Sequence, residues 1–242
     1  MPYFLSEQKL SVGATALIEG AQASHLLKSR RYRNGERFAM QDPAGRRWLV
    51  ELVEDRGRAA AVKVLDALPL PEPPPLSLHL LPAAIKDKAA DWLIQKATEL
   101  GVSALSFHPA ANSTVSHKLL AASHTLARWE KIAWEACKQC DRQYPPRLQV
   151  LGSFELALEA SQDTGLTWLL DPAGEPPQDR MPGMEPSAAK SARVLVGPEG
   201  GFTEGEIAAA QAAGFAPIKL GGQTLRAETA ALAAASLLLF GG

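Results

Sequence analysis

A glycine-rich segment near the C-terminus has the residue types of a ligand-binding loop. It spans residues 194–206, VLVGPEGGFTEGE, and passes from three apolar residues directly into a loop. Thr203 and Glu206 have the spacing of a capping box, so we expect a helix to begin directly after the loop. In open α/β sheets, ligands bind where the carboxyl end of a buried strand leads into such a helix. The alternative is a plain tight turn in which Pro198 fixes φ.

The composition of this loop argues against a phosphate ligand. Its glycines follow neither of the common phosphate-binding spacings, and no lysine comes after them. Glu199 lies in the middle of the loop, where its carboxylate would repel a polyphosphate. We therefore expect a ligand that presents hydroxyls, amides or a positive charge.

A second candidate loop lies within residues 218–240, IKLGGQTLRAETAALAAASLLLF. An apolar strand ends there at two glycines, and a polar segment with Arg226, Glu228 and Thr229 leads into a helix rich in alanine and leucine. One interpretation is a second binding loop beside the first. The other is an ordinary helix start with a local ion pair between Arg226 and Glu228.

Other catalytic or metal chemistries have little support in the sequence. Cys137 and Cys140 form a C-x-x-C inside a long helical pattern, without the helix N-terminus of a redox pair or the further ligands of a zinc site. We expect them to be reduced structural thiols. The histidines show no metal-binding spacing, and there is no G-x-S-x-G nucleophile motif, so we expect neither a metal site nor covalent hydrolysis.

Two different element patterns flank a proline-rich segment. Residues 1–70 contain short alternating strands and one short helix near 21–30, which suggest a small β-barrel. Residues 71–76 form a stiff, proline-rich linker. In residues 77–242 apolar strands alternate with helices, which is typical of an α/β fold with a mainly parallel sheet and helices on both faces. A loop is expected at residues 173–190.

Composition and charge narrow the class of protein. With 242 residues, of which 46% are hydrophobic and 21% charged, the chain has the composition of a globular protein. It has no signal-peptide pattern and no apolar run long enough to cross a bilayer, so we expect a cytoplasmic location. The net charge is -1, but residues 25–37, HLLKSRRYRNGER, are strongly basic. This segment is either a polyanion-binding surface or a solvated arginine-rich face.

Four segments, taken in order, resemble one family of enzymes. KDKAADWLIQKATELGV, RWEKIAWEACKQCDRQYPP, VLVGPEGGFTEGE and LGGQTLRAETAAL look like the motifs of the bacterial small-subunit (16S) rRNA uridine-N3 methyltransferases. The N-terminal HLLKSRRYRNGE is also similar to a segment of that family. The resemblance implies a SPOUT-type α/β domain with a C-terminal trefoil knot, a PUA-like barrel that helps to hold RNA, and a homodimer. Neither periodicity nor spacing indicates the knot.

The resemblance also implies a cofactor and a substrate. The cofactor is S-adenosyl-L-methionine, whose sulfonium cation and ribose hydroxyls suit a loop without phosphate-binding features. The substrate is small-subunit ribosomal RNA, free or in the assembled subunit. The implied cofactor-binding residues are Leu170, Gly197, Glu199, Gly200, Gly201, Leu220, Gly221, Leu225 and Thr229. The implied RNA-binding residues are His25, Lys28, Arg30, Arg31, Arg33 and Arg142.

Arg226 is the candidate catalytic residue. Loss of the uracil N3 proton leaves negative charge on the ring, which a positioned cation would stabilise. The sequence departs from the family at Ala227, where threonine is more usual, and at Asn112, where arginine often occurs. Two alternatives stay open: an enzyme of the same fold that methylates another base atom or a ribose 2′-oxygen, and an RNA-binding assembly factor without catalysis. The intact loop segments favour an enzyme.

Overall fold

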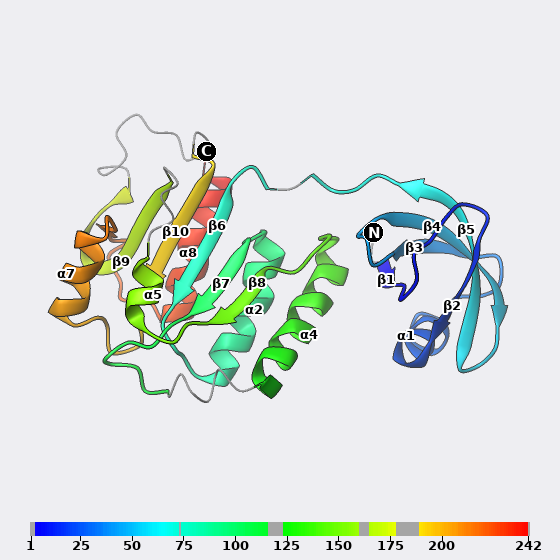
Figure 1. Cartoon of the computed structure of the whole chain (residues 1–242), viewed down its shortest axis with the longest axis horizontal. Helices are drawn as coiled ribbons and strands as arrows, with labels where there is room; N and C mark the ends of the chain where they lie inside the picture. The colour runs from blue at the N-terminus through cyan, green and yellow to red at the C-terminus, as the bar shows by residue number, and fades with distance from the viewer. Residues whose placement is uncertain (1–2, 73, 116–122, 160–164, 178–188, 242) are drawn as a thin grey trace. The chain divides into compact units, whose positions relative to one another are not determined.

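A computed structural model of the chain describes residues 3–72, 74–115, 123–159, 165–177 and 189–241 (Figure 1). The chain divides into two compact units. The first consists of Met1–Glu72 and Cys137–Tyr144, and the second of Pro73–Ala136 and Pro145–Gly242. No helix among the described residues is long and apolar enough to span a bilayer.

The N-terminal unit contains a curled five-stranded sheet of order β1-β3-β4-β5-β2. Its strands are β1 (Tyr3–Leu5), β2 (Thr15–Glu19), β3 (Arg37–Gln41), β4 (Arg47–Asp55) and β5 (Ala59–Leu68). The expected short helix has two parts, α1 (Gly20–Ser24) and a π-helical turn, η1 (His25–Ser29). Ala23 and Leu26 of these helices share one apolar core with Phe38 and Val50 of the sheet. The sheet thus wraps around a core as in the small barrel that the sequence predicts.

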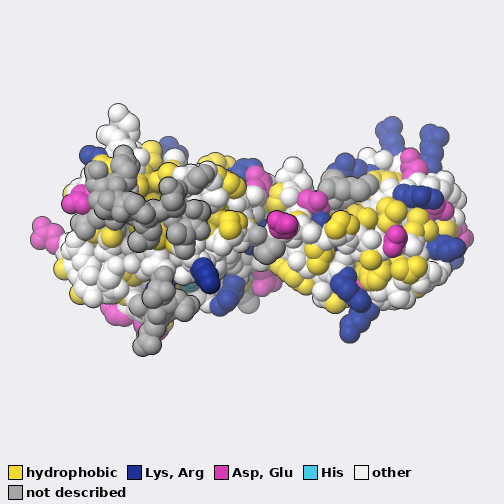
Figure 2. Space-filling model, turned by 90° about the horizontal axis from the view of Figure 1, so that it is seen from above, with side chains coloured by type: hydrophobic (Ala, Val, Ile, Leu, Met, Phe, Trp, Pro, Cys, Tyr) yellow, Lys and Arg dark blue, Asp and Glu magenta, His cyan; other side chains and the backbone are white. Residues whose placement is uncertain are grey.

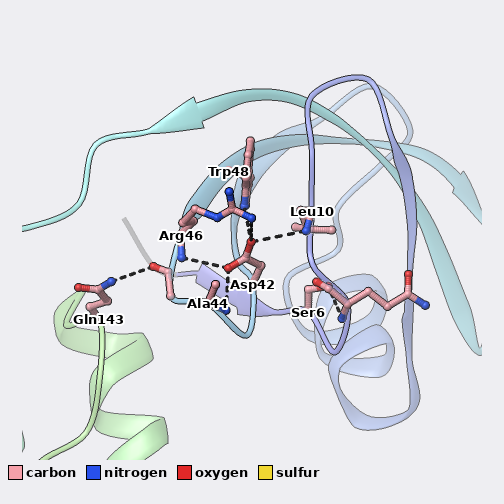
Figure 3. A network of polar contacts seen from close by, with 9 residues as sticks. Ser6, Leu10, Asp42, Ala44, Arg46, Trp48 and Gln143 are labelled. Atoms are coloured by element: carbon pink, nitrogen blue, oxygen red, sulfur yellow. Dashed lines mark hydrogen bonds and ion pairs between the residues drawn. The ribbon is translucent and has the colours of Figure 1, made fainter.

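A buried carboxylate, Asp42, holds the turn between β3 and β4 (Figure 3). Asp42 Oδ1 accepts hydrogen bonds from the N–H groups of Ala44 and Arg46, and Oδ2 accepts one of 3.2 Å from the Trp48 indole. Burial raises the pKa of Asp42, but the bonds from Trp48 and from backbone N–H groups outweigh it and hold that pKa below its usual value. The Arg46 guanidinium lies 3.2 Å from the same carboxylate, so this cation takes part in the fold.

The α/β unit contains a six-stranded sheet of order β11-β9-β10-β6-β7-β8, in which neighbouring strands are parallel. Its strands are β6 (Ser77–Pro82), β7 (Ala104–Phe107), β8 (Arg147–Val150), β9 (Leu166–Glu175), β10 (Ser191–Val196) and β11 (Ala216–Ile218). The helices that follow these strands are α2 (Asp87–Leu100), α4 (Ser123–Cys140), α5 (Phe154–Leu158), α7 (Glu204–Ala212) and α8 (Ala227–Phe240). The predicted α/β fold with a parallel sheet is confirmed.

Helices cover both faces of this sheet (Figure 1). On the face of α2 and α8, Val194 belongs to a core cluster with Ala231. On the face of α5 and α7, Leu195 belongs to another cluster with Ala157 and Ala210. Successive side chains of a strand point to opposite faces, so two adjacent residues of β10 serve two cores. This double burial explains why the successive residues Val194, Leu195 and Val196 are all apolar.

β9 is longer than the sequence predicts. The loop expected at 173–190 begins inside this strand, which continues to Glu175 and pairs there with Ile218 of β11. Residues 178–188 of the expected loop lie outside the described residues. β9 is extended because it pairs with a strand that is distant in the sequence, and local composition does not predict such pairing. The trefoil knot implied by the family resemblance stays a prediction.

Candidate functional site

A cavity of about 410 Å³ lies beside the carboxyl ends of β10 and β11. Its walls come from residues 170–172 of β9, from most of residues 196–202 at the end of β10 and after it, and from most of residues 218–227 between the end of β11 and the start of α8. Three neighbouring strands of one parallel sheet thus contribute to it. This is the edge of an open α/β sheet at which ligands are expected.

The cavity brings together most of the residues proposed for the cofactor. The predicted residues that line it are Leu170, Gly197, Glu199, Gly201, Leu220, Gly221, Leu225 and Arg226. Gly200 and Thr229 are not among its lining residues. Gly200 packs against another loop instead, and Thr229 lies exposed in the first turn of α8. The two loops singled out in the sequence therefore form a single pocket.

The glycine loop, residues 197–202, turns tightly before α7. Gly201 N–H donates a hydrogen bond of 2.9 Å to Pro198 O, and Gly201 has a φ of 72°, which favours glycine. α7 then begins with the predicted capping box. Thr203 Oγ1 accepts a hydrogen bond of 3.2 Å from Glu206 N–H, and Glu206 Oε2 accepts one of 2.8 Å from Thr203 N–H. The spacing of Thr203 and Glu206 thus predicts where the loop ends and α7 begins.

A second loop, residues 108–115 after β7, supports the glycine loop from outside the cavity. Asn112 Nδ2 donates hydrogen bonds of 3.3 Å to Gly200 O and 3.1 Å to Gly201 O. A Cβ on Gly200 would lie 2.9 Å from the Cβ of Asn112, so this approach requires glycine. Sequence reasoning identifies Asn112 only as a departure from the family. It misses this role because the contact joins residues 88 positions apart.

Phe202 packs closely against Gly197, so a side chain at position 197 would crowd the Phe202 ring. A Cβ on Gly197 would lie 3.1 Å from Cδ2 of Phe202. The Phe202 ring stacks on the buried ring of His108, with centroids 6.1 Å apart and an interplanar angle of 11°. Burial lowers the pKa of His108, while carbonyl oxygens of Pro109 and Leu81 near its ring nitrogens oppose that shift. His108 therefore supports the back of the glycine loop and does not line the cavity.

Arg226 is the N-cap residue of α8 and lines the cavity. Its backbone is extended, with φ of -65° and ψ of 153°, and its side chain is exposed. Among the ion pairs of the described residues, none joins Arg226 to Glu228. The alternative interpretation, a simple helix start, expects an ion pair between Arg226 and Glu228, and these two described residues do not form it. The guanidinium is available to a ligand.

Lysine and arginine side chains stand out from the surface of the N-terminal unit (Figure 2). Five predicted RNA-binding residues are exposed: His25, Lys28, Arg30, Arg31 and Arg33. None of them takes part in an ion pair among the described residues. By contrast, Arg37, Arg46 and Arg47 pair with Glu51, Asp42 and Asp141. The five predicted RNA-binding side chains are therefore free to contact a polyanion.

Arg142 differs from the other predicted RNA-binding residues because it is half-buried. Its carbonyl oxygen accepts a hydrogen bond of 2.6 Å from Tyr3 Oη, and its N–H donates one of 3.1 Å to Cys137 O. Burial lowers the pKa of the Arg142 guanidinium and raises that of the Cys137 thiol to about 12. Such a thiol is inert at neutral pH. The described residues contain no group of three or more side chains suited to a metal ion.

Comparison with known proteins identifies the family. Residues 72–239 match the family model of an RNA methyltransferase domain. The ribosomal RNA small subunit methyltransferase E of Mycobacterium bovis is 30% identical over 225 residues, which cover 92% of this chain and 85% of that protein. The chain belongs to the ribosomal RNA small subunit methyltransferase E family. The Bacillus subtilis member is 27% identical, with 98% of this chain and 94% of that protein covered.

Two solved structures share the fold. A ribosomal RNA small subunit methyltransferase E from Neisseria gonorrhoeae, bound to S-adenosyl methionine, matches with a TM-score of 0.83 and 30% identity over 98% of this chain and 96% of that chain. A methyltransferase from Legionella pneumophila, also in complex with this cofactor, matches with a TM-score of 0.84 at 24% identity over 98% and 96% of the two chains. The family suggested by the four sequence motifs is therefore confirmed.

Proposed function

We propose that this methyltransferase E family member transfers the methyl group of S-adenosyl-L-methionine to N3 of a uridine in small-subunit ribosomal RNA. Family membership supports the cofactor and the class of substrate. The observation that carries the proposal is the cavity into which the glycine loop and the Arg226 segment converge. The position of the methylated atom rests on the family resemblance.

The residues of the cavity fit the chemistry of this cofactor. A volume of about 410 Å³ lies within the usual size of small-molecule sites. The side chains of Leu170, Leu220 and Leu225 give apolar surface for an adenine ring. The carboxylate of Glu199 favours a cationic sulfonium and disfavours a polyphosphate. The cavity thus matches a nucleoside with a positive charge and no phosphate.

The reaction is an in-line methyl transfer. When bound, S-adenosyl-L-methionine would supply a methyl group activated by its sulfonium, and the uracil N3 would accept that methyl group after releasing its proton to solvent. Most of the catalysis comes from holding the two reactants in line. Negative charge develops on the uracil ring and its two carbonyl oxygens. Of the cations that line the cavity, Lys219 and Arg226, we assign Arg226 to stabilise this charge.

The RNA side of the reaction involves the N-terminal unit. N3 lies on the Watson–Crick edge, so the target uridine must be unpaired or flipped out of its stack. Exposed cations at positions 28–33 bind phosphates and position the RNA without reading its sequence. A PUA-like role for this unit and a homodimer are parts of the same proposal.

The decisive experiment uses ribosomal RNA from a strain that lacks the gene. Free rRNA and assembled small subunits are incubated with the protein and labelled S-adenosyl-L-methionine, and the product is mapped by nuclease digestion and mass spectrometry. We expect N3-methyluridine at one position. A 2′-O-methyl group or a different methylated base would refute the N3 assignment. Cofactor binding without transfer to either substrate would instead favour an assembly factor.

A further inference from the structure

We propose that Asn112 is a positioning residue that turns one backbone donor, the Phe202 N–H, toward the bound cofactor. The inference rests on the proposed function, because it takes S-adenosyl-L-methionine as the ligand of the cavity. Asn112 lies outside the cavity walls, whereas Gly201 and Phe202 line them. Asn112 therefore acts through the peptide bond that joins these two residues.

The direction of this N–H follows from peptide geometry. In a trans peptide the C=O and N–H groups point in opposite directions, and the described chain contains no cis peptide. Asn112 Nδ2 holds Gly201 O at 3.1 Å, so that carbonyl faces the loop after β7. The Phe202 N–H, on the same peptide, must point to the opposite side. That side is the cavity, since Asn112 approaches the glycine loop from outside it.

The Phe202 N–H is also uncommitted. Among the described residues it donates to no hydrogen-bond acceptor, whereas the preceding N–H, of Gly201, donates to Pro198 O at 2.9 Å. A Cβ on Gly197 would lie 3.5 Å from the Phe202 nitrogen, so glycine at 197 leaves this donor uncovered. A backbone N–H at the wall of a binding cavity needs an acceptor when a ligand displaces water from it.

The ligand can supply that acceptor from its uncharged or anionic parts. The adenine ring nitrogens, the ribose hydroxyls and the carboxylate of S-adenosyl-L-methionine accept hydrogen bonds, and the sulfonium does not. The demethylated product, S-adenosylhomocysteine, carries the same acceptors. The contact should therefore contribute equally to the affinities of cofactor and product, unlike a contact that recognises the positive charge.

Amide exchange in the wild-type protein tests the donor directly. In ¹⁵N-labelled protein, we expect the Phe202 N–H to exchange rapidly without ligand and to be protected at saturating S-adenosyl-L-methionine or S-adenosylhomocysteine. Unchanged exchange of this amide in protein that demonstrably binds the ligand would overturn its role as a donor. Absence of any binding by calorimetry would instead count against the proposed function itself.

The Asn112→Ala variant tests the positioning role. We expect the Kd values for cofactor and product to rise together by about 3–10-fold, the net worth of one hydrogen bond, with kcat at saturating cofactor within about 2-fold of wild type. Asn112→Asp, which places a carboxylate against two carbonyl oxygens, should bind more weakly still. Thr114→Ala, an exposed change in the same loop, is the matched control. Wild-type Kd values in both Asn112 variants would overturn the proposal.

Discussion

Ala111 N–H donates a hydrogen bond of 2.8 Å to Oε1 of Glu206. The other carboxylate oxygen of Glu206 accepts bonds of 2.8 and 2.9 Å from the N–H and Oγ1 of Thr203. One side chain therefore joins the loop after β7 to the end of the glycine loop and the first turn of α7. Glu206 therefore has a tertiary contact in addition to its capping role, and the spacing of the capping box does not predict that contact.

Glu206→Ala should lower the free energy of unfolding by about 1–2 kcal/mol, because it removes a capping interaction and leaves the Ala111 N–H without its acceptor. It should also weaken cofactor binding, since the glycine loop loses one of its anchors. Urea denaturation and calorimetry measure the two effects. Glu204→Ala, an exposed change in the same helical turn, should stay within about 0.5 kcal/mol of wild type. Equal losses in both variants would refute the specific role of Glu206.

Glu199→Gln should reduce the preference for the charged cofactor over the uncharged product. The carboxylate lines the cavity, and its attraction for the sulfonium in a partly solvated site is on the order of 1 kcal/mol. We expect a rise in the Kd for S-adenosyl-L-methionine of about 3–10-fold, with the Kd for S-adenosylhomocysteine within about 2-fold of wild type. Calorimetry with both ligands measures the two Kd values. A parallel change in the two Kd values would show that Glu199 does not recognise the charge.

Features encoded over a few residues could be predicted from the sequence. The start of α7 follows from the spacing of Thr203 and Glu206, and the parallel sheet follows from apolar strands that alternate with helices. Gly101 ends α2 with a φ of 97°, a position that favours glycine. The convergence of both loops in one cavity also follows, because the carboxyl ends of parallel strands share one edge of the sheet.

Features that depend on distant contacts could not be predicted. The extension of β9 requires β11, and the position of Asn112 becomes meaningful only when Gly200 and Gly201 lie against it. Arg142 is half-buried, and its carbonyl oxygen accepts a hydrogen bond from a tyrosine 139 positions away, which the resemblance that assigned it to RNA does not indicate. In each case the environment of the residue depends on a tertiary contact, which the local sequence pattern does not indicate.

Arg226→Ala should lower the rate of methyl transfer in a single turnover by about 100–1000-fold, the usual effect of removing one donor to a developing negative charge. The Kd for S-adenosyl-L-methionine should change by less than about 3-fold, because the guanidinium acts on the uracil and carries the same sign as the sulfonium. Arg226→Lys, which keeps the charge without the fork of donors, should recover part of the rate. Near-normal single-turnover rates in Arg226→Ala would remove this residue from the mechanism.

Combined replacement of Lys28, Arg30 and Arg33 by alanine should weaken RNA binding and reduce its dependence on salt. The slope of log Kobs against log salt is negative, and each lost phosphate contact should reduce its magnitude by about 0.7–0.9. Cofactor affinity should be unchanged, since these side chains belong to the other unit of the chain. Arg56→Ala removes an exposed cation already paired with Glu54 and serves as the control. If Arg56→Ala changed the salt dependence by as much as each of the three replacements does, Lys28, Arg30 and Arg33 would have no special role in RNA binding.

His79 is held neutral inside the α/β unit. Its Nε2 lies 2.7 Å from Ser106 Oγ, and Gln149 Nε2 donates a hydrogen bond of 2.6 Å to the same oxygen. Because that oxygen accepts from Gln149, its own proton is available to His79 Nε2, which then acts as the acceptor. Burial, followed by the positive charges of Arg193 and Arg147, lowers the pKa of His79 from 6.5 to about 4.

Acidification should therefore destabilise the protein through His79. Between pH 6.5 and about 4 the unfolded chain binds a proton that the folded chain does not, so this contribution to stability is complete above that range and is lost as the pH falls through it. Because His79 is partly exposed, we expect the loss to be about 1–2 kcal/mol. His79→Gln, whose side-chain oxygen can accept the Ser106 proton without titrating, should lack this part of the pH dependence. Urea denaturation of both proteins at pH 7 and pH 4.5 provides the comparison. An equal decrease in both would show that protonation of His79 is not coupled to folding.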